Sequence, residues 1–484
     1  MEPPPKKRCP HSTTAPELTL GAPRAQAASG RYVTKGGVTI DRLVQPLADP
    51  SDALEGLIDQ LDQERGCVFQ SSYEVPGRYA RWTMGFVNPP LAFEAWGRRF
   101  SISALNKRGS VLLPAILAAL QGIPALASLK ADGDAALHGT VKEVETFFTE
   151  EERSRQHSIF SVVRALIDLF GYDLEVQLGL YGAFGYDLTF QFETIALTQR
   201  RDATQRDLVL YLPDEIMVIQ PSPSPNPNPN PNPSPSPSPN PNPNPNPNPD
   251  QVIDVLANAS WRLSYDFTAA GQSTAGLPRT GAALAFAPLP VEQLPRRRDH
   301  GPGDFARKVE LAKEQFRLGN LFECVLSQTF TEPCPQPPSE VFRRLRKRNP
   351  SPYGFLLNLG DTEFLVGASP EMFVRVEHND KGWRCETCPI SGTIRRGRDA
   401  LEDAENIKQI LSDKKEESEL TMCTDVDRND KSRICKAGSV QVIGRRQIEM
   451  YSRLIHTVDH VEGYLREGFD GLDAFLGHTW AVAV

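Results

Sequence analysis

Cysteine is scarce in this chain, with eight residues in 484. That number is too small for a disulfide scaffold in a protein of this length. Cys385 and Cys388 form a single CxxC pair, and no second pair or histidine pair follows at the spacing of a zinc site. Because a structural zinc needs four ligands, we expect reduced and mostly buried thiols.

The sequence also lacks a long, uninterrupted apolar run. Its most apolar window covers 111–129, and Pro114, Gly122 and Pro124 interrupt it. Proline breaks a helix, and a membrane span needs about 20 apolar residues. The window therefore predicts an amphipathic helix–turn–helix, and we expect a soluble protein with no membrane partner.

No apolar segment typical of a secretory signal occurs in the first thirty residues. Residues 1–30 therefore predict a disordered tail or an organellar transit segment. The expected compartment is the cytoplasm, or the plastid stroma if the source is a photosynthetic eukaryote.

Excess positive charge is missing as well. The net charge is −8, which argues against nucleic acid as a partner. A small anionic substrate remains compatible, because a local basic pocket can oppose the global charge. A content of 39% hydrophobic and 24% charged residues indicates a globular protein with one large or two medium domains.

Proline, by contrast, is concentrated in one Pro/Asn/Ser repeat within 220–250. Alternating proline blocks helical and ladder hydrogen bonds, so this segment predicts an extended low-complexity insertion. The flanking stretches "DLVLYLPDEIMVIQ" and "ASWRLSYDF" are rich in strand-forming residues. We interpret them as consecutive strands with the repeat inserted into their turn, which divides the chain into 31–219 and 251–484.

Helical and strand patterns are interspersed along both parts without a regular βαβ repeat, which indicates an α+β fold. The stretch 400–426 predicts helix. The stretch 303–330 predicts a helix, a turn at Gly319 and then a strand. Residues 353–378 predict three strands separated by a turn and a Gly-Ala-Ser-Pro corner, and 439–465 predicts further strands.

Three segments place polar groups where a packed sheet does not favour them. Glu371 follows the Gly-Ala-Ser-Pro corner, where it can act as a general acid or base or lie exposed at a strand edge. Gly392 and Thr393 precede three arginines, a pattern that fits an anion-binding turn or a plain turn. His456 lies within an apolar strand, as a catalyst or as a core histidine.

The acidic stretch "SDKKEESELTMCTDVDRND" (412–430) predicts a helix capped by Asp413 with Glu416 three residues on. Glu416 and Glu419 share one face of that helix, which can be a charged surface or part of a metal site. We expect residues 427–430 to form the turn after this helix.

Taken together and in order, five blocks of the sequence resemble the chorismate-utilising enzymes, and specifically anthranilate synthase component I. These blocks are "NPSPYGFLLNLG", "GASPE", "PISGT", "DKKEESELTM" and "YSRLIHTVDHVEG". The segments "GRYARW" and "LYGAFGYDLTFQFE" resemble the subtype fused to a glutamine amidotransferase. The resemblance implies two packed, largely antiparallel sheets flanked by helices, with 251–484 as the chorismate-binding catalytic region.

The resemblance also implies roles for individual residues. Glu371 resembles the acid–base carboxylate beside the departing C4 hydroxyl, and His456 the histidine associated with pyruvate elimination. Gly392 and Thr393 resemble substrate contacts, and Glu419 resembles a ligand of Mg²⁺. The implied reaction converts chorismate and ammonia to anthranilate and pyruvate, with ammonia supplied from glutamine by an amidotransferase domain or subunit.

Two further positions bear on specificity and regulation. Ser391 stands where aminodeoxychorismate synthases carry a nucleophilic lysine, which favours anthranilate synthase; an aminodeoxyisochorismate synthase of the phenazine type stays open. Feedback inhibition by tryptophan is implied through Ser72 and through the stretch Pro352, Tyr353 and Gly354.

The sequence departs from the family pattern near residue 484. Ala483 stands where a threonine is usual, and Asn320 where an aspartate is usual. The Gly-Ala-Pro-Lys block and the segment with the second magnesium glutamate do not occur in the sequence. We therefore expect an incomplete catalytic region with unpaired core strands and exposed apolar surface. A non-catalytic fragment that binds tryptophan or a partner is the alternative.

Overall fold

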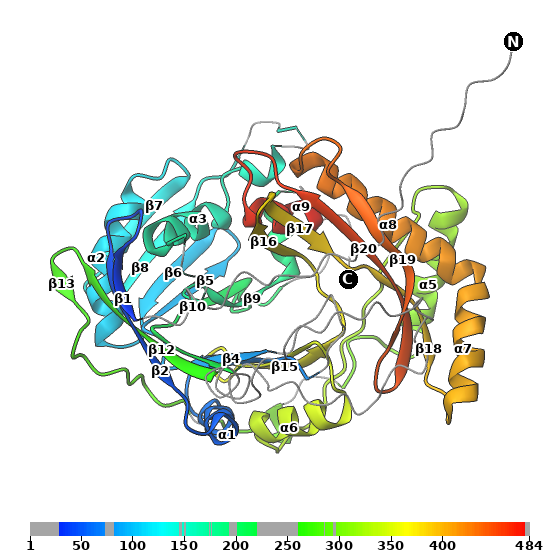
Figure 1. Ribbon diagram of the computed structural model, residues 1–484, viewed down its shortest axis with the longest axis horizontal. Helices are drawn as coiled ribbons and strands as arrows, with labels where there is room; N and C mark the ends of the chain where they lie inside the picture. The colour runs from blue at the N-terminus through cyan, green and yellow to red at the C-terminus, as the bar shows by residue number, and fades with distance from the viewer. Residues whose placement is uncertain are drawn as a thin grey trace, which may run out of the picture.

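The computed structural model describes residues 29–72, 82–144, 148–149, 152–173, 175, 177–192, 201–219, 260–284, 286–293 and 297–479. Of the predicted tail 1–30, residues 1–28 lie outside these residues, whereas Gly30 already begins the strand Gly30–Val33. The predictions for the repeat within 220–250 and for Ala483 also lie outside them. Within the described residues the structure is α+β, as the sequence predicts, and each pair of neighbouring strands is antiparallel, for example β19 with β20 and β11 with β12. The strands form three sheets rather than the expected two (Figure 1).

The largest sheet has the order β1-β2-β12-β11-β4-β3-β14-β15, with β13 paired to β12. Its strands are β1 (Gly30–Val33), β2 (Thr39–Pro46), β3 (Gly66–Gln70), β4 (Thr83–Val87), β11 (Glu215–Ile219), β12 (Ser260–Ala269), β13 (Gln272–Ser273), β14 (Tyr353–Asn358) and β15 (Phe364–Ser369). Helices α1 (Pro50–Gln60) and α6 (Pro338–Arg348) pack on one face through a cluster that includes Ile58, Val68, Phe342 and Leu356.

The strands on either side of the proline-rich repeat pair as predicted. β11 and β12 are antiparallel neighbours, with Ile219 opposite Ser260 and Glu215 opposite Ser264. The chain therefore enters and leaves the segment 220–259 at the adjacent ends of two paired strands inside the sheet. This geometry explains how a long insertion is compatible with the sheet, because loop-closure cost grows only slowly with loop length.

The second sheet has the order β7-β8-β6-β5-β10-β9. Its strands are β5 (Leu91–Trp96), β6 (Arg99–Ala104), β7 (Leu126–Asp132), β8 (Ala136–Val141), β9 (Tyr181–Phe184) and β10 (Leu208–Leu212), packed with α2 (Lys107–Gln121) and α3 (Ile159–Phe170). The predicted helix–turn–helix over 111–129 is wrong in its second half. Pro124 follows the end of α2, and the apolar residues beyond it form β7, which pairs with β8.

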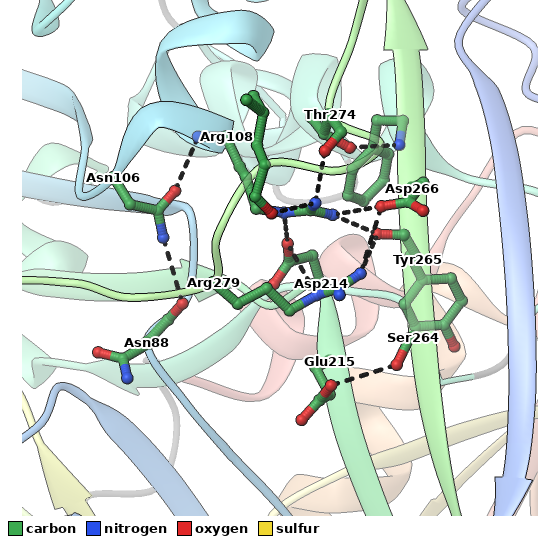
Figure 2. A network of polar contacts seen from close by, with 12 residues as sticks. Asn88, Asn106, Arg108, Asp214, Glu215, Ser264, Tyr265, Asp266, Thr274 and Arg279 are labelled. Carbon is green, nitrogen blue, oxygen red and sulfur yellow. Dashed lines mark hydrogen bonds and ion pairs between the residues drawn. The ribbon is translucent and has the colours of Figure 1, made fainter.

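Figure 2 shows a buried ion network that joins these two sheets. Arg108, on α2, is buried and donates to the carboxylates of Asp214 and Asp266 and to the carbonyl oxygens of Tyr265 (2.7 Å) and Thr274 (2.6 Å). Burial raises the pKa of Asp214, and the neighbouring Arg108 opposes that rise. Because every charged group in the network has a partner, the network fixes α2 against β12.

The third sheet has the order β16-β17-β20-β18, with β19 on the other edge of β20. Its strands are β16 (Arg375–Asn379), β17 (Gly382–Thr387), β18 (Ile390–Arg395), β19 (Gln441–Met450) and β20 (Leu454–Tyr464). Helices α7 (Ala400–Ser412) and α8 (Lys414–Ile434) lie along its outer side, and α9 (Gly471–Thr479) lies beside α8 (Figure 1). The expectation that 427–430 forms a turn is wrong, because α8 continues through these residues to Ile434.

The segment 303–330 agrees with the sequence only in part. Helix α5 (Asp304–Arg317) and the turn at Gly319, with φ of +75°, form as predicted. The expected strand after the turn does not form; within 320–330, all of which the structure describes, the one isolated β-bridge is that of Phe330 with Arg298. Without a neighbouring strand to pair with, the backbone of 321–329 stays irregular, and several of its apolar side chains, Phe322 and Val325 among them, are exposed.

The remaining short elements are the 3₁₀ turns η2 (Arg153–Arg155), η3 (Tyr186–Gln191) and η4 (Val291–Gln293). Among the helices of the described residues, none is both long enough and apolar enough to cross a bilayer.

Candidate functional site

Glu371 lies at the corner that follows β15. Its backbone N–H donates to Ser369 Oγ (3.2 Å), which fixes the turn, and its Oε1 accepts from the backbone N–H of Ile390 (3.3 Å) at the start of β18. The carboxyl borders a cavity of about 260 Å³ whose walls include Phe184 and Phe475. These contacts rule out the exposed strand-edge alternative for this residue.

The apolar surroundings change the acidity of that carboxyl. Burial raises the pKa of Glu371 to about 7, and the negative charge of Asp427 adds to the rise, while the Ile390 N–H opposes it. A carboxyl with this pKa exists in both protonation states near neutral pH. It can therefore donate a proton as well as accept one.

His456 lies on β20 and is 6% exposed. Its Nδ1 is 2.9 Å from Thr393 Oγ1, which brings two of the predicted site residues into direct contact. Burial lowers the pKa of His456, so the imidazole is neutral at neutral pH. The buried histidine thus reaches Thr393, whose side chain is exposed.

Gly392 has a left-handed backbone, with φ of +86°. A Cβ atom at this position would lie 2.4 Å from Thr457 Oγ1 and 3.4 Å from the side chain of Glu416. The strand pairing shifts here, between Ser391 and Thr393, as in a β-bulge. Glycine is therefore required, and the bulge turns the backbone toward α8.

Tyr451 connects the surroundings of Glu371 with those of His456, and the sequence patterns did not single it out. Its hydroxyl donates to the buried carboxylate of Glu449 (2.6 Å) and lies 3.3 Å from the carbonyl oxygen of Pro370. Its ring meets the His456 ring edge-on, with the centroids 5.3 Å apart. In the sequence, Tyr451 simply follows Glu449 at the end of a strand, and this pattern does not predict that its hydroxyl and ring contact two parts of the site.

The carboxylates of α8 lie next to the Gly392 bulge. Asp413 caps the helix as predicted, accepting from the backbone N–H groups of Lys415 and Glu416. The ammonium of Lys415 lies 3.1 Å from Glu416 and also forms an ion pair with Glu419. One cation thus bridges two carboxylates on the face that approaches the bulge.

This pair fits the needs of Mg²⁺, which binds through one or two carboxylates and keeps several waters. Glu323 is a neighbour, because the charge of Glu419 adds to the effect of burial in raising the pKa of Glu323. Within the described residues, no three His, Cys, Asp or Glu side chains are grouped closely enough to form a complete metal site. The structure thus places Glu416 beside the Gly392 bulge and pairs Glu419 with the same lysine, and the described residues supply only part of an ion's ligands.

The residues expected to bind tryptophan lie together at the junction of β3 and β14. The backbone N–H of Ser72 donates to the Ser351 carbonyl, and the Ser351 N–H donates to Ser72 Oγ, both at 3.0 Å. Pro352 is buried, Tyr353 packs against a small apolar cluster, and Gly354 is opposite Gln70 in the sheet. The Ser351 hydroxyl is buried and has no hydrogen-bond partner among the described residues, and the sequence did not mark it.

Cys385 and Cys388 are both fully buried. Cys385 shares a hydrogen bond with Cys435. The thiols are therefore packed into the core of the third sheet, as the sequence predicts.

Comparison with known proteins agrees with this geometry. The sequence profile described as "chorismate binding enzyme" matches residues 124–484. A protein of Azospirillum brasilense named anthranilate synthase is 49% identical over 94% of this chain and 56% of its own length. A protein of Pseudomonas aeruginosa named anthranilate synthase component 1, pyocyanine specific, is 29% identical over 83% of this chain and 71% of its own length.

The chain thus spans little more than half of the Azospirillum relative. Among solved structures, anthranilate synthase component I from Streptococcus pneumoniae aligns with a TM-score of 0.49 and 21% identity, over 84% of this chain and 73% of that one. The profile match covers most of the chain and includes every candidate catalytic residue. The chain belongs to the family of chorismate binding enzymes.

Proposed function

We propose that this chain is the chorismate-converting part of an anthranilate synthase, which forms anthranilate, pyruvate and water from chorismate and ammonia. The observation that carries the proposal is the carboxyl of Glu371, held by the Ile390 N–H at the border of an apolar cavity with a pKa of about 7. The 49% identity to a protein named anthranilate synthase supports it.

The site residues divide the reaction between them. Ammonia forms a C–N bond at C2 of chorismate as the C4–O bond breaks, and protonated Glu371 supplies the proton with which the hydroxyl leaves as water. The C2 proton and the enolpyruvyl oxygen at C3 are then eliminated, which makes the ring aromatic and releases pyruvate. His456, neutral through burial, is suited to accept the ring proton.

The bulge at Gly392 and the Thr393 hydroxyl are suited to hold the substrate beside these two groups. Glu419, with Glu416, would hold Mg²⁺, which neutralises a substrate carboxylate when bound. Ser391 stands where aminodeoxychorismate synthases carry a nucleophilic lysine, and serine has no amine. This supports direct addition of ammonia rather than a covalent intermediate. A glutamine amidotransferase domain or subunit would supply the ammonia.

The same proposal includes regulation by tryptophan. The indole would pack against Pro352 and Tyr353, and the partnerless Ser351 hydroxyl beside Ser72 offers a hydrogen bond to an amino-acid group. Thermal unfolding of the chain with and without tryptophan tests this part. We expect a higher midpoint with tryptophan in the wild-type chain and a smaller increase in Ser351→Ala. An equal increase in both chains would contradict the assignment of Ser351.

The catalytic proposal is tested by anthranilate fluorescence with chorismate, Mg²⁺ and ammonia, and by chromatography of the products. We expect Glu371→Gln and His456→Ala to lower kcat by about 10²- to 10⁴-fold, the range for a lost general acid or base. Glu377→Gln, an exposed carboxylate on β16, is the matched control and should retain full activity. An amino product that keeps its enolpyruvyl group would instead identify an aminodeoxyisochorismate synthase. A folded chain that neither binds nor converts chorismate would overturn the proposal.

A further inference from the structure

Helix α8 carries a buried charged cluster on its inner face, away from the proposed metal carboxylates. Lys431 is fully buried, and its ammonium donates to Thr387 Oγ1 at the end of β17. The Thr387 hydroxyl in turn donates to the carboxylate of Asp427, one helical turn earlier than Lys431. A threonine hydroxyl thus links the two buried charges.

His478, on α9, completes this cluster. Its Nδ1 is 2.7 Å from the Ala474 carbonyl oxygen, so Nδ1 carries the hydrogen and Nε2 presents its lone pair to the Lys431 ammonium at 3.3 Å. Burial and the charge of Lys431 lower the pKa of His478 to about 3, which keeps the ring neutral. Thr387, Asp427, Lys431 and His478 together are called the Asp427 cluster below. Burial raises the pKa of the Asp427 carboxyl, and the charge of Lys431 and the hydrogen bond from Thr387 oppose that rise.

The Asp427 cluster is connected to Glu371 through two neighbouring elements. Thr387 is three residues before Ile390, whose backbone N–H donates to Glu371. On the other side, α9 carries both His478 and Phe475, and Phe475 lines the cavity that Glu371 borders. The cluster therefore joins α8, the end of β17 and α9 around the one carboxyl that the proposed reaction needs as an acid.

Stability alone does not account for buried charges at this position. Replacing a buried ion pair with apolar side chains of similar size is often neutral or stabilising, because desolvation cancels the attraction. We propose that Asp427 and its cluster are positioning groups, which hold the Thr387–Ile390 corner against Glu371 and present a negative charge to it. This inference rests on the proposed function only in that it takes Glu371 to be the acid.

The titratable groups that face Glu371 determine the direction in which Asp427→Asn should shift the pKa of Glu371. Asp427 and Cys423 approach it from α8, and Tyr186 lines the same cavity from η3. Burial raises the pKa of the Cys423 thiol to about 12, so this thiol is uncharged at neutral pH. Asp427 is therefore the group whose negative charge acts on Glu371. Asp427→Asn keeps the size of the side chain and an oxygen for the Thr387 hydroxyl, but it removes that charge.

The test is an infrared titration of Glu371 in the full 484-residue chain. The band of its protonated carboxyl is identified by its loss in Glu371→Gln. We expect Asp427→Asn to lower the midpoint of this band by about 0.5 to 1 pH unit, as for the loss of a nearby like charge. Asp425→Asn is the matched control on the same helix, because its side chain is exposed and pairs with Arg428, and it should leave the midpoint unchanged.

Should Asp427→Asn fail to fold, the double substitution Asp427→Asn with Lys431→Met is compared with Lys431→Met alone, so that the difference between the two midpoints still reports the charge of Asp427. An unchanged Glu371 midpoint in a folded variant would overturn the inference, even if the variant were less stable, because a merely structural cluster would change stability alone. The titration needs no turnover. Failure of the proposed activity would therefore leave this result interpretable, and failure of this inference would leave the activity untouched.

Discussion

At the scale of single residues, the raised pKa of Glu371 links folding to pH. A pKa of about 7 in the folded chain, against an ordinary value of 4.5, means that the folded state binds the additional proton between these values. This carboxyl therefore destabilises the fold progressively as the pH rises from about 4.5 to about 7.

We predict that Glu371→Gln, which cannot ionise, is more stable than the wild-type chain at pH 8 by about 1 to 3 kcal/mol. The difference should disappear at pH 4, where the carboxyl is protonated in both states. Urea unfolding at the two pH values measures it. Glu377→Gln, at an exposed position, should show no such pH dependence. An equal difference at pH 4 and pH 8 would mean that the Glu371 carboxyl is not shifted.

Gly392 offers a second prediction at this scale. Gly392→Ala introduces both left-handed strain and a clash with Thr457 Oγ1, whereas Gly438→Ala, at φ of +76° with open space around it, introduces the strain alone. We expect Gly438→Ala to cost about 1 kcal/mol of unfolding free energy. Gly392→Ala should cost a further 1 to 3 kcal/mol or so, as for overpacking. Equal costs in urea unfolding would show that the bulge has room for a side chain.

At the scale of elements, the break between α7 and α8 decides where the carboxylates of α8 point. Asp413 ends one helix and caps the next. We predict that Asp413→Ala lowers the unfolding free energy by about 1 kcal/mol, the usual cost of a lost cap, and that Asp413→Ser restores most of it. Calorimetric titration with Mg²⁺ and chorismate should show weaker binding in the alanine variant only. Retained stability in Asp413→Ala would argue that packing, not the cap, starts α8.

The sequence predicted those elements whose partners lie close in the chain or whose pattern is strong. The pairing of β11 with β12, the helix α5 and the cap at Asp413 all follow local rules. The prediction from the sequence failed where tertiary contacts decide which element forms. Residues 321–330 have a strand pattern without a neighbouring strand, and 427–430 look like a turn because they are polar.

The candidate site likewise contains residues that the sequence indicated and residues that it missed. Glu371, Thr393 and His456 stand out through their types and neighbours. The structure brings Thr393 into contact with His456, and Tyr451 lies between His456 and the corner that carries Glu371. Asp427 and Lys431 were missed, because charged residues on a helix ordinarily indicate a solvated face. Their burial depends on Thr387 and His478, which are distant in the sequence.

At the scale of the whole molecule, the segment that follows α5 leaves apolar side chains in solvent. Phe322 is 72% exposed and Val325 53% exposed, and the neighbouring Leu318 is exposed as well. Contiguous apolar surface of this kind promotes association. We predict that the chain self-associates at micromolar concentration, as measured by sedimentation velocity.

Replacing Phe322 and Val325 together with lysine should reduce this association without lowering the unfolding free energy, because neither side chain is packed. Leu401→Lys, on α7, is the matched control: Leu401 is 79% exposed, but it lies away from this segment in the sequence. It should leave the association unchanged. Equal effects of the two changes would assign the association to surface hydrophobicity in general.

The pairing of Ile219 with Ser260 has one more consequence, for protein engineering. Because the chain leaves and re-enters the sheet at neighbouring positions, a folded guest domain with adjacent termini can take the place of the proline-rich repeat. A fluorescent reporter joined there would keep both hairpin strands in register. The β11–β12 turn is thus a ready attachment point, remote in sequence from Glu371 and His456.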